Sequence, residues 1–127
     1  MKYLLLMYAN KSEAPQAPEE LQAIATAWYA FMAEAKAAGV LLDNNGLDPL
    51  ATTTTIRVRE GKTLTTDGPF AETREVLGGF YLIDVKNLDE AIAIAARHPG
   101  APVGTVEIRP VMELAGLPAD NGGPKSR

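Results

Sequence analysis

The sequence contains no cysteine and a single histidine, His98. The absence of cysteine excludes a disulfide framework, a thiolate metal site and a cysteine nucleophile. One histidine is too few for a zinc site, and it gives little support to heme chemistry. We therefore expect neither a metal nor any other cofactor.

Clustered positive charge and long apolar runs are also missing. Twelve basic residues against 16 acidic ones give a net charge of -4, and no basic stripe is present, which disfavours a nucleic-acid partner. The apolar start, Tyr3–Ala9, is far shorter than the roughly 20 residues of a membrane span. It is followed by Asn10-Lys11-Ser12-Glu13 without a small-residue cleavage site, so we read it as a buried strand and predict a cytoplasmic protein without membrane contact.

The pattern of apolar and polar residues over 1–114 predicts one small α+β domain. Residues 115–127 show no such pattern and are expected to form a disordered tail. Periodicity predicts helices from Pro18 to Ala38 and from Asn87 to just before Pro99. The segment Val40–Leu50 is expected to be extended or looped, because Asn44-Asn45-Gly46 is a turn signal. Strands are predicted at Lys2–Tyr8, Thr52–Arg59, Thr63–Thr66, Gly79–Val85 and Gly104–Met112.

Apolar stripes predict which helix faces are buried. In the second helix Asn87 is expected to cap the first turn and Glu90 to reach back, as in a capping box. His98 follows in the last turn, where a cation would interact favourably with the helix dipole. Tyr29 lies off the stripe and is expected to edge a cleft. The predicted stripe of the first helix is Leu21, Ile24, Ala25, Trp28, Met32 and Ala35, and that of the second is Leu88, Ala91, Ile92 and Ala95.

The element order predicts a ferredoxin-like βαββαβ arrangement, with both helices on one face of an antiparallel sheet. The first strand is apolar on both sides and is expected to be central. The uncovered sheet face would then be a large apolar patch, which soluble proteins avoid. We therefore expect a homodimer in which two sheets meet face to face.

The loop Asp67–Glu75 is the most unusual stretch. Asp67-Gly68-Pro69 predicts a tight turn, and Phe70 is expected to fix it to the core. Asp67, Glu72 and Glu75, with Arg74 among them, could hold a cation, orient a water or share a raised pKa. The alternative is a structural loop whose acids are solvated.

A second candidate site lies on the predicted strands. Alternation places Arg57 on one strand, and Glu107 and Arg109 on another, opposite the apolar residues of those strands. Facing a cavity between protomers, they would suit a small anionic or carboxylate ligand. The alternative is intersubunit salt bridging or solvated edge strands. Arg57 and Glu107 are not expected to pair within one subunit, because their strands would form opposite edges.

The runs DGPFAETRE, LGGFYLIDV, LDEAIAIAARHP and GTVEIRPV resemble the YCII-related family, in its DGPF-type branch, over Met1–Leu114. The resemblance implies a dimeric α+β barrel of ferredoxin-like protomers. It also implies an active site with a His–Asp pair in a cleft near the dimer interface. The relatives' histidine lies in the first helix, where this sequence has none, so only Asp67 can be carried over. Arg74 stands where the branch often has lysine.

Two functions remain open from the sequence. The first is a cofactor-independent small-molecule enzyme, with Asp67 as acid or base and Arg57, Arg74 or Arg109 stabilising an anion. The second is a non-catalytic metabolite-binding or regulatory module. The branch resemblance adds that such members look like companions of extracytoplasmic-function sigma factors.

Overall fold

A computed structural model describes residues 1–10, 17–48, 50–70 and 73–113. The predicted tail and Glu72 lie outside these residues. The elements in chain order are β1 (Lys2–Asn10), α1 (Pro18–Ala37), β2 (Leu41–Gly46), a 3₁₀ turn (Leu50–Thr52), β3 (Thr54–Arg59), β4 (Lys62–Asp67), β5 (Glu75–Asp84), α2 (Leu88–Ala96) and β6 (Thr105–Pro110).

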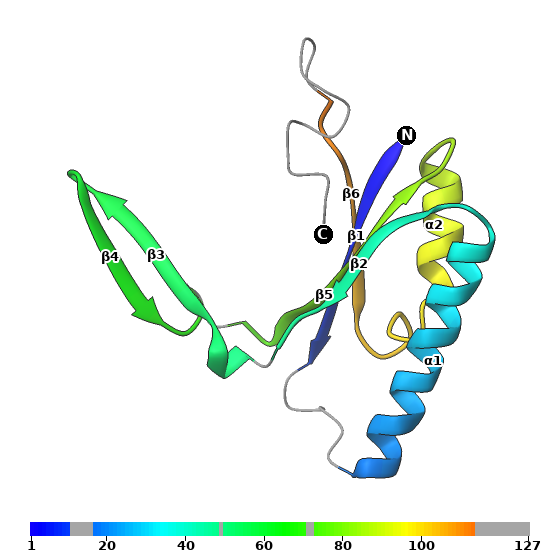
Figure 1. The fold of residues 1–127 in the computed structure, drawn as a ribbon, viewed down its shortest axis with the longest axis horizontal. Coiled ribbons are helices and arrows are strands. Elements are labelled where there is room, and N and C mark those ends of the chain that lie inside the picture. The colour runs from blue at the N-terminus through cyan, green and yellow to red at the C-terminus, as the bar shows by residue number, and fades with distance from the viewer. Residues whose placement is uncertain (11–16, 49, 71–72, 114–127) are drawn as a thin grey trace.

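Four strands form one antiparallel sheet in the order β2-β5-β1-β6, and both helices cover the same face of it (Figure 1). The fold is therefore α+β with an antiparallel sheet and two helices, compatible with a ferredoxin-like fold. The strand β1 is central, as the sequence predicts, because it pairs with β5 on one side and β6 on the other.

The strands β3 and β4 form a separate hairpin inserted between β2 and β5. Their two-residue loop, Glu60-Gly61, has positive φ at both positions (52° and 75°), as in the type I′ turn that matches strand twist. The interpretation of 52–59 as an edge strand of the main sheet is wrong. That edge is β2, in the segment where Asn44-Asn45-Gly46 favoured a turn.

The core lies between the sheet and the helices. Its fully or nearly fully buried residues come from alternate positions of the central strands and from one side of each helix: Tyr3, Leu5, Met7, Phe31, Tyr81, Ile83, Val85, Ala91 and Ala95. Neither α1 nor α2 lies over the opposite sheet face, which we call the open face (Figure 1).

Both predicted helix stripes are only partly correct. In α1 the residues Leu21 and Ile24 are 50% and 40% exposed, because the first half of the helix extends past the sheet (Figure 1). Phe31, outside the predicted stripe, is buried instead. In α2 Ala91 and Ala95 are buried, while Leu88 and Ile92 are each 48% exposed.

Candidate ligand-binding site

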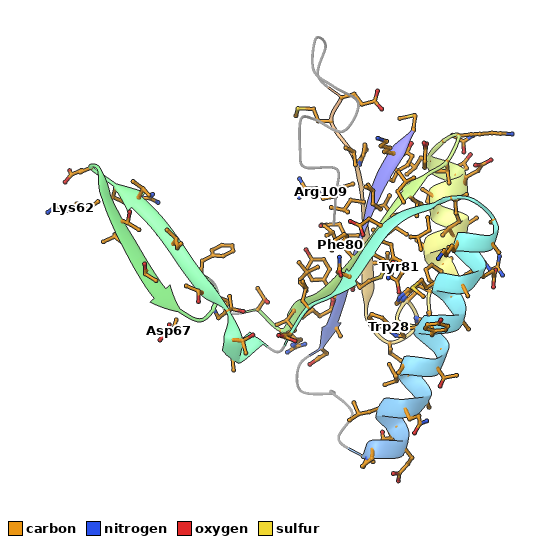
Figure 2. All side chains as sticks on the ribbon, viewed as in Figure 1. Trp28, Lys62, Asp67, Phe80, Tyr81 and Arg109 are labelled. Carbon is orange, nitrogen blue, oxygen red and sulfur yellow. The ribbon has the colours of Figure 1, made fainter. Side chains whose placement is uncertain are left out.

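A pocket of about 210 Å³ opens between α1, β2 and β5. The helix contributes one face at i, i+3, i+4 and i+7 spacing, and the strands contribute the facing wall. Trp28 and Tyr81 both lie in the layer between α1 and the sheet (Figure 2). The lining residues are Ala25, Trp28, Tyr29, Met32, Asn44, Asn45, Gly46 and Tyr81.

A glycine sets the position of the β2 wall. A Cβ on Gly79 of β5 would lie 2.9 Å from the carbonyl oxygen of Asn45, which is closer than real Cβ atoms approach. Only glycine therefore lets β2 lie this near to β5 at the point where Asn45 and Gly46 line the pocket. Tyr29, 68% exposed, forms the outer edge, as predicted for it.

Tyr81 supplies the main polar group of the pocket. The residue is only 4% exposed, and its hydroxyl makes no hydrogen bond to any described residue. Burial raises the pKa of this hydroxyl, so it stays protonated and able to donate. The amide of Asn44 donates only to the sulfur of Met32, at 3.5 Å, and a thioether is a weak acceptor. Both donors therefore have capacity for a stronger acceptor.

His98 lies behind this pocket and is 1% exposed. Its ring packs edge-to-face on Trp28, Phe31 and Tyr81, with centroids 4.6, 4.8 and 5.2 Å away. The Nδ1 atom accepts a hydrogen bond from the amide of Gly100 at 2.9 Å, which assigns the ring proton to Nε2. Nε2 has no hydrogen-bond partner among the residues that the structure describes.

Burial lowers the pKa of His98 to about 4, so the ring is neutral at neutral pH. The expected cation at the helix end is therefore wrong. The helix α2 ends at Ala96, and the following turn directs the His98 side chain into the core.

The residues predicted from the sequence lie elsewhere. Asp67 ends β4, and its side chain is exposed and bonded to no described residue. The following turn is held through Gly68, whose amide donates to the Thr53 carbonyl and whose carbonyl accepts from the Thr55 hydroxyl, at 2.6 and 2.7 Å. Phe70 is 78% exposed, so its predicted attachment to the core is wrong within this chain.

The fold brings together only two of the three charged strand residues predicted to form a site, Glu107 and Arg109. Glu107 and Arg109 lie on the same side of β6, next to Leu6 and Leu4 on the open face, and Figure 2 shows Arg109 on the side away from the helices. The Tyr8 hydroxyl donates to Glu107 at 3.5 Å. Arg57 lies on the separate hairpin, and exposed Arg74 precedes β5. One chain does not unite Arg57 with Glu107.

Within the described ranges, no three acidic, histidine or cysteine residues gather closely enough to hold a metal ion. No helix of the described chain has the length and apolarity needed to span a membrane.

The pocket was not predicted from the sequence, because it depends on the pairing of β2 with β5. The segment 40–50 was expected to be extended or looped with a turn at Asn44-Asn45-Gly46, which gave Asn44 and Asn45 no place in a sheet, and Tyr81 was expected only as part of an apolar strand. The i, i+4 pair Trp28 and Met32 was the available signal, but it also fits ordinary core packing.

The architecture defines a class: a small α+β protein with two helices on one face of an antiparallel sheet and a pocket beneath the first helix. The chain belongs to the YCII-related family, whose domain model matches residues 1–115. It is also 37% identical over 114 residues to an uncharacterized protein of Rhizobium meliloti (strain 1021), with 87% of this chain and 92% of that protein covered.

Proposed function

We propose that this protein binds a small, flat, uncharged metabolite in the pocket between α1 and β2, without converting it. The observation that carries the proposal is the Tyr81 side chain, which lines the pocket and whose hydroxyl has no hydrogen-bond partner within the described chain. Among the described residues, the buried side-chain polar atom without a partner is His98 Nε2, so the unbonded Tyr81 hydroxyl retains access to solvent and can donate to a ligand acceptor.

The walls indicate the ligand class. Trp28, Tyr29 and Met32 offer aromatic and thioether surface, and none of the lining residues is charged. A cavity of about 150 Å³ holds a benzene ring, so about 210 Å³ suits one ring with a small substituent. A ring bearing a carbonyl would stack on the aromatic wall and accept from Tyr81 and Asn44.

Binding is favoured over catalysis by the protonation states of the site. An efficient general base has a pKa near the working pH, whereas that of His98 is lowered to about 4 and that of Tyr81 is raised. Asp67, the residue favoured from the sequence, is exposed in a single chain. Catalysis by Asp67 would need a second chain to enclose it.

We also propose that the protein is a homodimer formed through the open face. Leu4 and Leu6 of β1 and Phe80 and Leu82 of β5 are paired neighbours on this face and are only partly buried. Covering them with a second copy would remove a contiguous apolar surface from water and support a dimeric barrel. The same dimer would enclose Glu107 and Arg109, where a small anion could bind.

We further propose that the chain belongs to the DGPF-type branch of the YCII-related family. The run DGPFAETRE supports the DGPF-type branch, and with it a regulatory role linked to sigma-factor signalling.

Trp28 is the only tryptophan, so its fluorescence reports on the pocket directly. We expect benzamide, a ring with a carbonyl, to change this fluorescence saturably, and toluene to do so more weakly. Tyr81→Phe keeps the ring and removes the donor, so benzamide should bind about five- to tenfold more weakly and toluene unchanged. Equal affinity of benzamide for both proteins, or no response to either probe, would contradict the proposed site.

A further inference from the structure

The hairpin β3–β4 extends away from the body of the protein, on the side of the sheet opposite the helices (Figure 1). Among the described elements, its two strands make extensive contacts only with each other. Every side chain of the hairpin strands is exposed except that of Thr55, which is half-buried.

Its register divides the hairpin into two chemically different faces. Ile56 pairs with Thr65 and Val58 with Thr63, so these β-branched residues share one face. The other face carries Arg57 opposite Leu64 and Arg59 opposite Lys62. Thr54 pairs with Asp67 at the base of the first face, so that face is apolar or β-branched along Ile56 and Val58 and ends at one carboxylate. The other face is cationic.

The first face lacks cover in a single chain. Ile56 and Val58 are 62% and 58% exposed, and Phe70, just beyond the hairpin, is 78% exposed. A two-stranded hairpin alone in water is marginally stable at best, and it needs a further packing surface to persist. Some other surface must therefore cover Ile56 and Val58.

We propose that this surface belongs to a second copy of the chain, and that the hairpin is a clasp that packs its Ile56–Val58 face against the partner. The proposal rests on the homodimer proposed above. The hairpin leaves the body on the side of the open face, so a copy seated on that face lies within its reach (Figure 1).

Charge complementarity supports the same occupant. The cationic hairpin face belongs to a chain whose net charge is -4. The open face carries carboxylates on both edge strands, Glu107 next to Leu6 and Asp43 next to Leu82, as well as the cation of Arg109 next to Leu4. With the apolar face packed on the partner, Arg57 and Lys62 would lie at the rim of the contact, where these carboxylates can meet them.

Sedimentation equilibrium tests the clasp with matched variants. Ile56→Thr combined with Val58→Thr keeps β-branched residues and removes apolar contact, so the dimer Kd should rise about tenfold or more. Leu64→Thr makes a similar change on the opposite face and should leave the Kd unchanged. An unchanged Kd in the double variant, with the wild type dimeric, overturns the clasp and leaves the dimer standing. A wild type that stays monomeric at every concentration overturns both.

Crosslinking locates the contact independently. Because the chain has no cysteine, Val58→Cys offers one attachment point for a thiol-linked benzophenone, and Leu64→Cys is its control. In mixtures of ¹⁴N- and ¹⁵N-labelled copies, we expect Val58→Cys to give mixed-isotope crosslinks to the partner. The Leu64 position should give few. Crosslinks confined to single copies from Val58→Cys would overturn the proposal.

Discussion

At the scale of single residues, His98 couples the pocket to the pH of the solution. Its ring contacts two residues that line the pocket, and it is held neutral by burial among aromatic rings. Protonation would place an unpaired charge in this core, which is costly. The packing of Trp28 and Tyr81 thus depends on His98 remaining uncharged.

This arrangement predicts a specific loss of stability in acid. The pKa of His98 is lowered from 6.5 to about 4, so the unfolded chain takes up the proton first as pH falls. The contribution of His98 to the free energy of unfolding should therefore decrease by up to about 3 kcal/mol between pH 6.5 and about 4. Below about pH 4 it should stay constant.

His98→Phe retains an aromatic ring and removes the titration. Urea unfolding across this pH range should show a shallower acid decline for the variant than for the wild type. The variant also loses the hydrogen bond from Gly100, which lowers stability by about 1 kcal/mol at every pH. Parallel pH profiles for the two proteins would contradict the assignment.

At the scale of elements, local sequence signals predicted the structure correctly where they agreed with tertiary packing. The start of α2 was predicted correctly: Asn87 Oδ1 accepts from the amide of Glu90 at 3.0 Å. The Glu90 carboxylate in turn accepts from the amide of Lys86 at 3.1 Å, one residue before the expected position. Such caps depend on residues three or four apart, so the sequence carries the necessary information.

The strand β2 shows the opposite case. Asn44, Asn45 and Gly46 have turn propensity, yet they pair with Tyr81, Phe80 and Gly79 of β5. Pairing with a strand more than 30 residues away in sequence overrode local preference, and no local pattern reveals that partner. The candidate pocket depends on this pairing, which explains why the sequence predicted the fold class but not the site.

The contribution of the α2 cap to the free energy of unfolding can be measured. Asn87→Ala removes the side-chain acceptor and should lower the unfolding free energy by about 1 kcal/mol in urea denaturation. Asn87→Asp preserves an acceptor and should stay close to the wild type. If alanine and aspartate behave alike, the cap does not contribute as described.

At the scale of the whole molecule, the proposed ligand pocket and the proposed dimer interface lie on opposite faces of the sheet. The pocket and His98 lie on the helix side, whereas Leu82 and Arg109 face the other way. Ligand binding and assembly are therefore expected to be separable by mutation.

Leu82→Arg tests that separation. Burying an arginine opposite a second apolar face is unfavourable, so the variant should sediment as a monomer where the wild type is a dimer. Because the pocket lies across the sheet, benzamide should still change Trp28 fluorescence in the monomeric variant. A dimeric Leu82→Arg protein would refute assembly through the open face.

The projecting hairpin also bears on how long a single copy survives. Arg57, Arg59 and Lys62 are cleavage points for trypsin-like proteases, and among the described elements the pairing of β3 with β4 is the main protection of this backbone in a lone subunit. Unpaired subunits would be cleaved there first, and the proposed dimer would shield the hairpin. Turnover of this protein would then follow its own abundance, with scarce, unpaired molecules removed faster than assembled ones.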